Sequence, residues 1–219
     1  METFAAAAPA ARYSLYLVTD SGLSRGRTNL AIVEAAIRGG VTIVQYREKN
    51  ASTRGMIEEA AELCRVCRTA GVPFIVNDRI DVALAVDADG VHVGQDDMPA
   101  SGARGLIGRR KILGVSAGSV EEARKAVDDG ADYIGASPVF STPTKPDAPP
   151  PLGVEGLRRM ARAVDIPVVA IGGINAANAA AMMEAGAAGI AVVSAIVAAE
   201  DVEAAARALR TVMEKVRMR

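Results

Sequence analysis

The chain has 219 residues, of which half are hydrophobic and only 3% are aromatic, and it has no tryptophan. This length and an aliphatic composition favour one domain of helices packed closely on strands over a β-sandwich. The 25 basic and 26 acidic residues give a net charge of −1, which excludes the broad positive surface of a nucleic-acid-binding protein.

The first residues, METFAAAAPAAR, are predicted to form a flexible N-terminal tail, residues 1–12. They lack the basic region and the long apolar run of a signal peptide. No segment has about 18 uninterrupted apolar residues, so we expect no membrane span. Residues 13–219 are predicted to form a single catalytic domain.

Short apolar runs alternate with helical patterns along that domain. Each run is rich in β-branched residues and nearly continuous in apolarity, as is typical of parallel strands buried on both faces. Between them, Thr28 and Gly39 are expected to bound one helix, and Ser119 with Glu122 to form a capping box at the start of another. The predicted strands are residues 14–19, 42–46, 74–77, 90–94, 111–115, 132–136, 167–171 and 189–193.

Two cysteines, Cys64 and Cys67, have the C-x-x-C spacing of a redox pair. The segment around them, TRGMIEEAAELCRVCRTAG, has the pattern of one amphipathic helix, whereas redox pairs of this type favour a helix N-terminus. Two ligands alone also cannot complete a zinc site. We interpret both cysteines as ordinary helix side chains, and two thiols without a disulfide framework favour a reducing, cytoplasmic location.

Eight strands that alternate with helices predict an α/β protein, a single-domain (β/α)8 TIM barrel. The alternative, a doubly wound open sheet, expects a G-x-G-x-x-G fingerprint after its first strand. Here the first strand is followed by DSGLSRGRTN, which lacks that motif. The active site of a barrel lies at the C-terminal ends of its strands, so the residues at these positions are the candidates for function.

Two aspartates follow neighbouring predicted strands, Asp78 after the third strand and Asp97 after the fourth. Mg²⁺ binds commonly through one or two carboxylates, waters and substrate phosphates, while the alternative is that both aspartates cap turns or helices. Groups that bind anions are predicted at the same end of the barrel and favour a phosphorylated ligand. These groups are Arg47, Lys49, Asn77, Ser116, Thr142, Thr144 and Lys145.

The segment VFSTPTKPDAPPPLG, residues 139–153, carries three of these groups among five prolines. Proline excludes it from a helix or a central strand, so we expect a lid loop over the ligand. A second anion site is predicted across the barrel, where Gly173 and Ser194 follow the seventh and eighth strands. The only histidine, His92, alternates with valines in GVHVG and is predicted to be packed and hydrogen-bonded rather than catalytic.

Seven motifs in this order resemble the thiamine phosphate synthase family, and the resemblance covers residues 15–196. They are Q-x-R-E-K (45–49), N-D (77–78), G-Q-D-D (94–97), V-S (115–116), T-P-T-K (142–145), I-G-G-I (171–174) and V-S-A (193–195). The resemblance implies a transferase of thiamine biosynthesis. It would join hydroxymethylpyrimidine diphosphate to hydroxyethylthiazole phosphate and release pyrophosphate, by a dissociative substitution assisted by one Mg²⁺ ion.

The resemblance also implies a role for each matching residue. Asp78 and Asp97 would hold the Mg²⁺ ion. The implied catalytic residues are Arg47, Lys49, Thr142, Thr144 and Lys145. The implied substrate contacts are Gln45, Tyr46, Arg47, Glu48, Lys49, Asn77, Ser116, Thr142, Pro143, Thr144, Lys145, Gly173, Val193 and Ser194.

The chain departs from the family pattern at two places. Ala136–Pro138 replaces the usual Gly-Pro before the lid loop, and Gly118 stands where many members have a histidine. The alternatives are a thiazole tautomerase of the same fold and a non-catalytic sensor of phosphorylated ligands. The expected partners are the two small-molecule substrates, with no nucleic acid and no membrane, and the sequence is compatible with a homo-oligomer.

Overall fold

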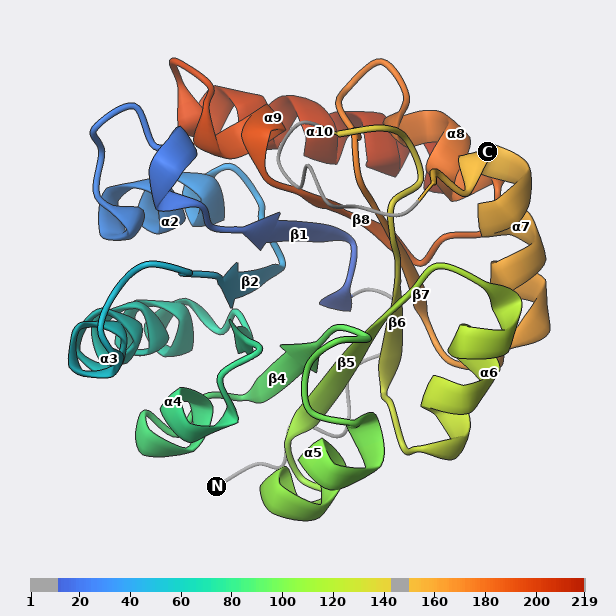
Figure 1. Ribbon diagram of the computed structural model, residues 1–219. Coiled ribbons are helices and arrows are strands. Elements are labelled where there is room, and N and C mark those ends of the chain that lie inside the picture. The colour runs from blue at the N-terminus through green and yellow to red at the C-terminus, as the bar shows by residue number, and fades with distance from the viewer. Residues whose placement is uncertain (1–11, 143–149, 219) are drawn as a thin grey trace.

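The computed structural model describes residues 12–142 and 150–218, and within them eight parallel strands close into a barrel in chain order (Figure 1). The predicted (β/α)8 fold and the positions of all eight strands are therefore confirmed. The strands are β1 (Leu15–Val18), β2 (Ile43–Tyr46), β3 (Phe74–Asn77), β4 (Gly90–Val93), β5 (Ile112–Ala117), β6 (Tyr133–Ala136), β7 (Val168–Ile171) and β8 (Gly189–Val192).

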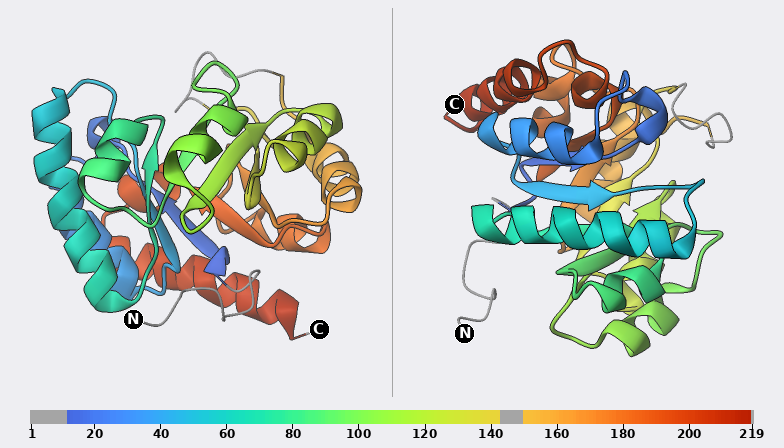
Figure 2. Two further views of the ribbon diagram at one scale, coloured as in Figure 1. Left: turned by 90° about the horizontal axis from the view of Figure 1, so that it is seen from below. Right: turned by 90° about the vertical axis from the view of Figure 1, so that its left-hand side faces the viewer.

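Helices surround the barrel and cover the outer faces of the strands (Figures 1 and 2). The last helix packs against three others, α2, α8 and α9. No helix in the described ranges is both long enough and apolar enough to span a membrane. The helices are η2 (Ser21–Leu23), α2 (Asn29–Arg38), α3 (Thr53–Ala70), α4 (Ile80–Ala85), α5 (Ala100–Ile107), α6 (Val120–Asp128), α7 (Gly153–Ala163), α8 (Ala179–Glu184), α9 (Ser194–Val197) and α10 (Val202–Arg217).

The helix ends follow the predicted caps, with one local difference at Glu122. Thr28 accepts a hydrogen bond from the Ala31 N–H and begins α2, and Gly39 ends this helix as its C-cap, as predicted. The left-handed residue of this turn is the next glycine, Gly40 (φ 98°). Ser119 caps α6 as predicted. The Glu122 carboxylate accepts from the N–H of Gly118 at 2.7 Å, one residue before the partner that a capping box would use.

Alternate side chains of each strand pack in two separate cores. One set, including Tyr16, Ile75 and Tyr133, fills the inside of the barrel. The other set, including Leu17 and Phe74, packs between the strands and the helices. Because successive strand residues point to opposite faces, nearly every strand contributes to both cores. The exception is β4, which places His92 inside the barrel and only Val91 and Val93 in a hydrophobic core.

Cys64 and Cys67 lie on α3 within the outer core, and both are buried free thiols. Burial raises the pKa of the Cys67 thiol to about 12. A thiol with a raised pKa holds little reactive thiolate. The structure thus confirms their interpretation as packed helix side chains.

Candidate active site

A cavity of about 300 Å³ opens at the C-terminal ends of the strands, and all eight strands contribute to its lining. Its size suits small ligands. It brings together residues separated by up to 178 positions, from residue 16 to residue 194. The predicted site residues that line it are Gln45, Arg47, Lys49, Asn77, Asp78, Asp97, Ser116, Thr142, Gly173, Val193 and Ser194.

Two residues of the Q-x-R-E-K motif do not line the cavity. The Tyr46 side chain points out of the barrel, where its hydroxyl donates to Glu59 at 2.8 Å and its ring stacks on Phe74. The Tyr46 side chain faces away from the cavity because Gln45 faces inward from the same strand. The substrate contact implied for Tyr46 therefore stays a prediction and is not supported by its side chain. Glu48 instead holds its own loop, since its carboxylate accepts from the Ser21 hydroxyl at 2.8 Å and from the Lys49 N–H at 2.7 Å.

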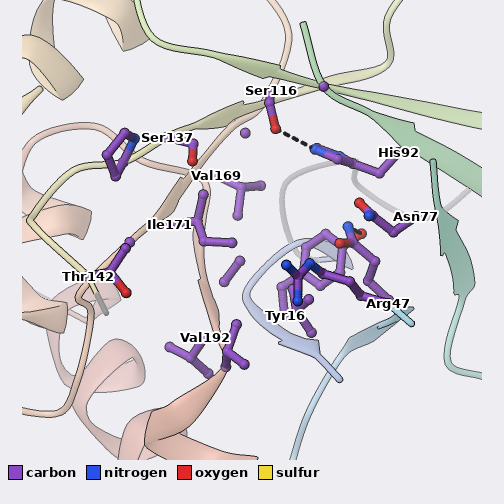
Figure 3. Close-up of a pocket in the computed structure, with 18 of the residues that line it drawn as sticks. Tyr16, Arg47, Asn77, His92, Ser116, Ser137, Thr142, Val169, Ile171 and Val192 are labelled. Atoms are coloured by element: carbon purple, nitrogen blue, oxygen red, sulfur yellow. Dashed lines mark hydrogen bonds between the residues drawn. The ribbon is translucent and has the colours of Figure 1, made fainter. Parts of the chain in front are cut away.

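Three further predicted residues, Pro143, Thr144 and Lys145, lie outside the described residues. Their assignments therefore stay predictions. Thr142, the residue directly before them, does line the cavity and lies across it from Arg47 and Asn77 (Figure 3).

The cationic side of the cavity is anchored by an ion pair that the sequence did not reveal. Arg47 Nη1 lies 2.9 Å from Asp20 Oδ2, and the two side chains are only 17% and 18% exposed. The other oxygen of Asp20 accepts from the Gly22 N–H at 3.0 Å and so begins η2. Asp20 directs the Arg47 guanidinium and fixes its rotamer at the cavity wall. The only sequence signal for this pairing was an acidic residue at the end of β1.

The two aspartates predicted to bind metal lie side by side in the cavity wall. Asp78 has a left-handed backbone (φ 60°), and its N–H donates to the His92 carbonyl at 2.8 Å. Asp97 accepts from the Gly94 N–H at 2.8 Å. The pKa of Asp78 is raised from 3.8 to about 7, first by burial and then by the hydrogen bond and charge of Asp97. Two carboxylates this close need a shared proton or a cation between them.

The other side of the cavity is built by the loops after β6 and β7. The Val139 N–H donates to the Ile171 carbonyl at 2.8 Å, and the Phe140 N–H donates to the Gly172 carbonyl at 3.1 Å. A methyl group added at Gly172 would lie 2.7 Å from the Pro138 side chain, and one at Gly173 would lie 2.8 Å from Phe140. These glycines therefore let the two loops pack closely, in addition to leaving Gly173 at the cavity wall.

Replacing Gly172 with alanine is expected to destabilise the protein by about 1–3 kcal/mol, because the added methyl overpacks the contact with Pro138. Gly186→Ala is the matched control, since Gly186 has a similar φ (98° against 104°) but its nearest neighbour would lie 3.4 Å away. Urea unfolding of both variants measures the difference. Equal free energies of unfolding in the two variants would show that backbone strain alone, and not the contact between the loops, makes glycine necessary at 172.

The end of the cavity opposite the aspartates is formed by Gly173, Val193 and Ser194. The short helix α9 begins at Ser194. The first N–H groups of a helix have no partner within it and are available to an anion. Backbone donors and a hydroxyl thus meet at the position predicted for the second phosphate.

Polar side chains also cover the floor of the cavity, and His92 is among them (Figure 3). Its two ring nitrogens lie 2.8 Å from the Tyr133 hydroxyl and 2.9 Å from Ser116 Oγ. His92 is packed and hydrogen-bonded, as predicted, and burial lowers its pKa to about 4. Tyr16 and Tyr133 line the same floor, and sequence analysis identified neither.

Comparison of the sequence with known protein families identifies the family of this chain. The family model described as thiamine monophosphate synthase matches residues 15–196. The chain belongs to the thiamine monophosphate synthase family. The matched range, residues 15–196, includes every site residue predicted above, from Gln45 to Ser194.

Relatives of the thiamine monophosphate synthase family match nearly the whole chain. The thiamine-phosphate synthase of Chloroflexus aurantiacus is 67% identical over 92% of this chain and 93% of its own. The one of Methanocella arvoryzae is 53% identical over 94% of this chain and 98% of its own. These relatives support the synthase assignment over the tautomerase and sensor alternatives.

A solved structure, the thiamine phosphate pyrophosphorylase from Pyrococcus furiosus, agrees with this family. It is 46% identical, with a TM-score of 0.88, and covers 94% of this chain and 98% of its own. A 3-hexulose-6-phosphate synthase also superposes, with a TM-score of 0.67 at 20% identity. That likeness shows the shared barrel fold alone.

Proposed function

We propose that the protein joins 4-amino-2-methyl-5-hydroxymethylpyrimidine diphosphate to 4-methyl-5-(2-hydroxyethyl)thiazole phosphate, giving thiamine phosphate and pyrophosphate. The observation that carries this proposal is one cavity whose two ends offer different hydrogen-bond donors and charges to an anion. One end combines Arg47, Lys49 and Asn77 with two aspartates, and the other has Gly173, Val193 and Ser194. Two phosphorylated substrates that meet in the middle fit this arrangement.

The first end suits the pyrimidine diphosphate. Gln45 and Ser116 lie on the floor of the cavity, where an amide and a hydroxyl can bind a heterocyclic ring. Arg47 and Lys49 stand above them with Asn77 and can donate hydrogen bonds to the diphosphate oxygens. Asp20 preorganises Arg47 for this contact through the 2.9 Å ion pair.

Asp78 and Asp97 fit one Mg²⁺ ion. Their carboxylates are close enough that the pKa of Asp78 is raised, and the described ranges contain no group of three or more side chains that could enclose a metal. Mg²⁺ commonly uses one or two carboxylates and completes its shell with water and substrate phosphates. When bound, the ion would neutralise negative charge on the diphosphate.

The chemistry proceeds by substitution at the pyrimidine CH₂ group. The bond between this carbon and the diphosphate oxygen breaks, and pyrophosphate leaves with the electron pair. The ring nitrogen of the thiazole then forms the new bond with its lone pair. That nitrogen carries no proton, so no general base is needed. Arg47, Lys49 and Lys145 are proposed to stabilise charge that develops on the leaving group.

The thiazole phosphate is proposed to bind at Gly173, Val193 and Ser194, with Thr142 and Thr144 between the two substrates. Holding both partners in line removes much of the entropic barrier, an effect of up to about 7–11 kcal/mol in well-oriented systems. The protein thus contributes mainly position and charge, which agrees with a site whose single histidine is already tied to two neighbours.

A pyrophosphate-release assay tests this function. With both substrates and Mg²⁺, we expect equal amounts of pyrophosphate and thiamine phosphate, and no release without the thiazole phosphate. Isomerisation of a thiazole substrate alone would identify a tautomerase instead. Substrate binding without any turnover would identify a sensor.

We further propose the setting in which this reaction takes place. The enzyme is cytoplasmic, its partners are the two phosphorylated small molecules, and residues 13–219 act as one catalytic domain behind the tail, residues 1–12. Association of copies of the chain as a homo-oligomer is compatible with this arrangement, because the cavity lies within one barrel.

The aspartate pair predicts a pH-dependent effect of metal. The folded-state pKa of Asp78 is raised from 3.8 to about 7, so the stability contributed by this group is present at low pH and is lost as pH rises through about 7. Without metal, the melting temperature of the wild type relative to Asp78→Asn should therefore fall between about pH 5 and about pH 8. Mg²⁺ takes the place of the proton between the carboxylates. It should therefore raise the melting temperature of the wild type more at about pH 8 than at about pH 5.

The comparison with Asp78→Asn removes an opposing contribution from His92. Burial lowers the pKa of His92 from 6.5 to about 4, so its contribution grows as pH rises over that interval. Thermal unfolding followed by circular dichroism, with and without Mg²⁺, gives both curves. Parallel curves for the wild type and the variant would contradict the shifted pKa of Asp78.

A further inference from the structure

Five side chains form a continuous row of hydrogen bonds beneath the cavity. Gln45 Nε2 lies 3.0 Å from the Tyr16 hydroxyl, which lies 2.7 Å from the Tyr133 hydroxyl. Tyr133 lies 2.8 Å from His92 Nδ1, and His92 Nε2 lies 2.9 Å from Ser116 Oγ. The five residues come from five different strands, β2, β1, β6, β4 and β5. Both ends of the row, Gln45 and Ser116, are the groups proposed to hold the pyrimidine ring.

The three inner members of the row are almost sealed from solvent. Tyr16 and Tyr133 are each 1% exposed and His92 is 8% exposed. Burial raises the pKa of both phenols, and the imidazole has only neutral side chains, Tyr133 and Ser116, as hydrogen-bond partners. All three groups are therefore neutral near pH 7. Each phenol has one proton to donate, and the imidazole has one N–H and one acceptor nitrogen.

A hydroxyl that accepted from both neighbours would leave its own buried proton without an acceptor. If each inner proton is used on a bond within the row, the protons can therefore be ordered in only two ways. In the first, the Gln45 amide donates to Tyr16, Tyr16 to Tyr133, and Tyr133 to His92 Nδ1. The N–H at His92 Nε2 then donates to Ser116, whose own proton is free for a ligand. In the second, every bond is reversed, and Ser116 uses its proton on His92. The contact from Gln45 Nε2 to the Tyr16 hydroxyl belongs to the first order.

We propose that Tyr16, Tyr133 and His92 are positioning residues that hold this first order, so that Gln45 offers a free carbonyl oxygen and Ser116 a free hydroxyl proton to the bound ring. This inference deepens the proposed function and rests on it for the identity of the ligand. An aminopyrimidine presents an amino donor and ring-nitrogen acceptors, which match these two groups. A ring with an oxo group in place of the amino group would meet a carbonyl oxygen with an acceptor.

Two glycines leave the space in which the Tyr133 and His92 rings pack. A methyl group added at Gly114 would lie 2.1 Å from the Tyr133 ring, and one at Gly135 would lie 3.1 Å from the His92 ring. The Tyr133 ring is also tilted against the rings of Tyr16 and His92, with centroid distances of 5.9 and 5.5 Å. The two strands β5 and β6 thus leave space for rings that are held from several sides.

The single histidine of the chain makes the proton order directly measurable. In protein labelled with ¹⁵N-histidine and freed of any affinity tag, the two ring nitrogens give one pair of signals, and the protonated nitrogen is identified by its shift. We expect the Nε2–H tautomer in the wild type at about pH 7. Finding the Nδ1–H tautomer would overturn the inference.

Gln45→Glu tests whether the order passes along the row. An ionised carboxylate can only accept, so Tyr16 must donate to it, and the whole row should reverse to give the Nδ1–H tautomer of His92. Spectra up to about pH 9 cover the ionisation of the introduced carboxyl. Adding Tyr133→Phe interrupts the row and should leave the tautomer independent of residue 45. An unchanged tautomer in Gln45→Glu, or a switch that persists in the double variant, would overturn the inference.

Kinetics provide a second readout. Tyr133→Phe should raise KM for the pyrimidine diphosphate by about tenfold, with a smaller effect on kcat and none on KM for the thiazole phosphate. Tyr13→Phe is the control, because the Tyr13 ring packs 4.8 Å from the Tyr133 ring but lies outside the row. Equal effects of the two variants would overturn the positioning role. The tautomer measurement needs no substrate, so failure of the proposed function and failure of this inference are distinguishable.

Discussion

Lys145→Ala is expected to lower kcat by about 10²–10³-fold, as does loss of one preorganised donor to developing charge in other enzymes. Lys145 ends the T-P-T-K motif, and its ammonium is proposed to meet the leaving diphosphate together with Arg47 and Lys49. Charge on the departing group grows as the carbon–oxygen bond breaks, so the loss should affect kcat more than KM. Steady-state measurement of pyrophosphate release gives both constants.

The matched control is Lys125→Ala. Lys125 is a lysine of α6 that is 71% exposed and pairs with Asp129 four residues later. Activity should be unchanged in this variant, and the unfolding temperatures of both variants should match the wild type. Undiminished product formation by Lys145→Ala would remove this residue from the catalytic set.

Asp78→Asn should lower kcat by a similar factor of about 10²–10³ while the metal-free protein becomes at least as stable as the wild type at about pH 8. The two effects have opposite signs because the carboxylate is unfavourable in the empty fold and useful only when a cation binds. Asparagine keeps the size of the side chain but removes the charge that faces Asp97. Activity as a function of Mg²⁺ concentration, together with thermal unfolding, tests both parts.

Asp81→Asn is the control for this substitution. Asp81 lies three residues further along the chain, and its carboxylate pairs with Arg79 at 2.6 Å on the surface. Its loss should leave activity and metal dependence unchanged. A destabilised but fully active Asp78→Asn variant would contradict the assigned metal site, since it would show that the carboxylate supports the fold and not the reaction.

Much of the fold was predictable because the strands of a barrel repeat one local pattern. Buried parallel strands are short and apolar, and a glycine at the end of the preceding helix marks where several of them begin. The shared location of the residues predicted to bind metal and phosphate was predictable for a related reason. Asp78, Asp97 and Ser194 follow the C-terminal ends of strands, and the barrel topology alone brings these ends to the same face of the barrel.

The remaining features depend on which side chains meet across the barrel. Tyr16 and Tyr133 are 117 positions apart, and no local pattern predicts that their hydroxyls lie 2.7 Å from each other. The pairing of Asp20 with Arg47 is of the same kind. The orientation of Tyr46 is different, because strand alternation next to the inward Gln45 would have placed it outside.

The tyrosines of this chain give it a natural optical reporter. With no tryptophan present, near-ultraviolet emission comes from four phenols, and three of them, Tyr13, Tyr16 and Tyr133, pack inside the barrel. The fourth, Tyr46, lies against Phe74 on the outer side. Occupancy of the floor by a heteroaromatic ring should therefore quench most of the intrinsic signal, which would allow titrations without dye, label or coupled enzyme.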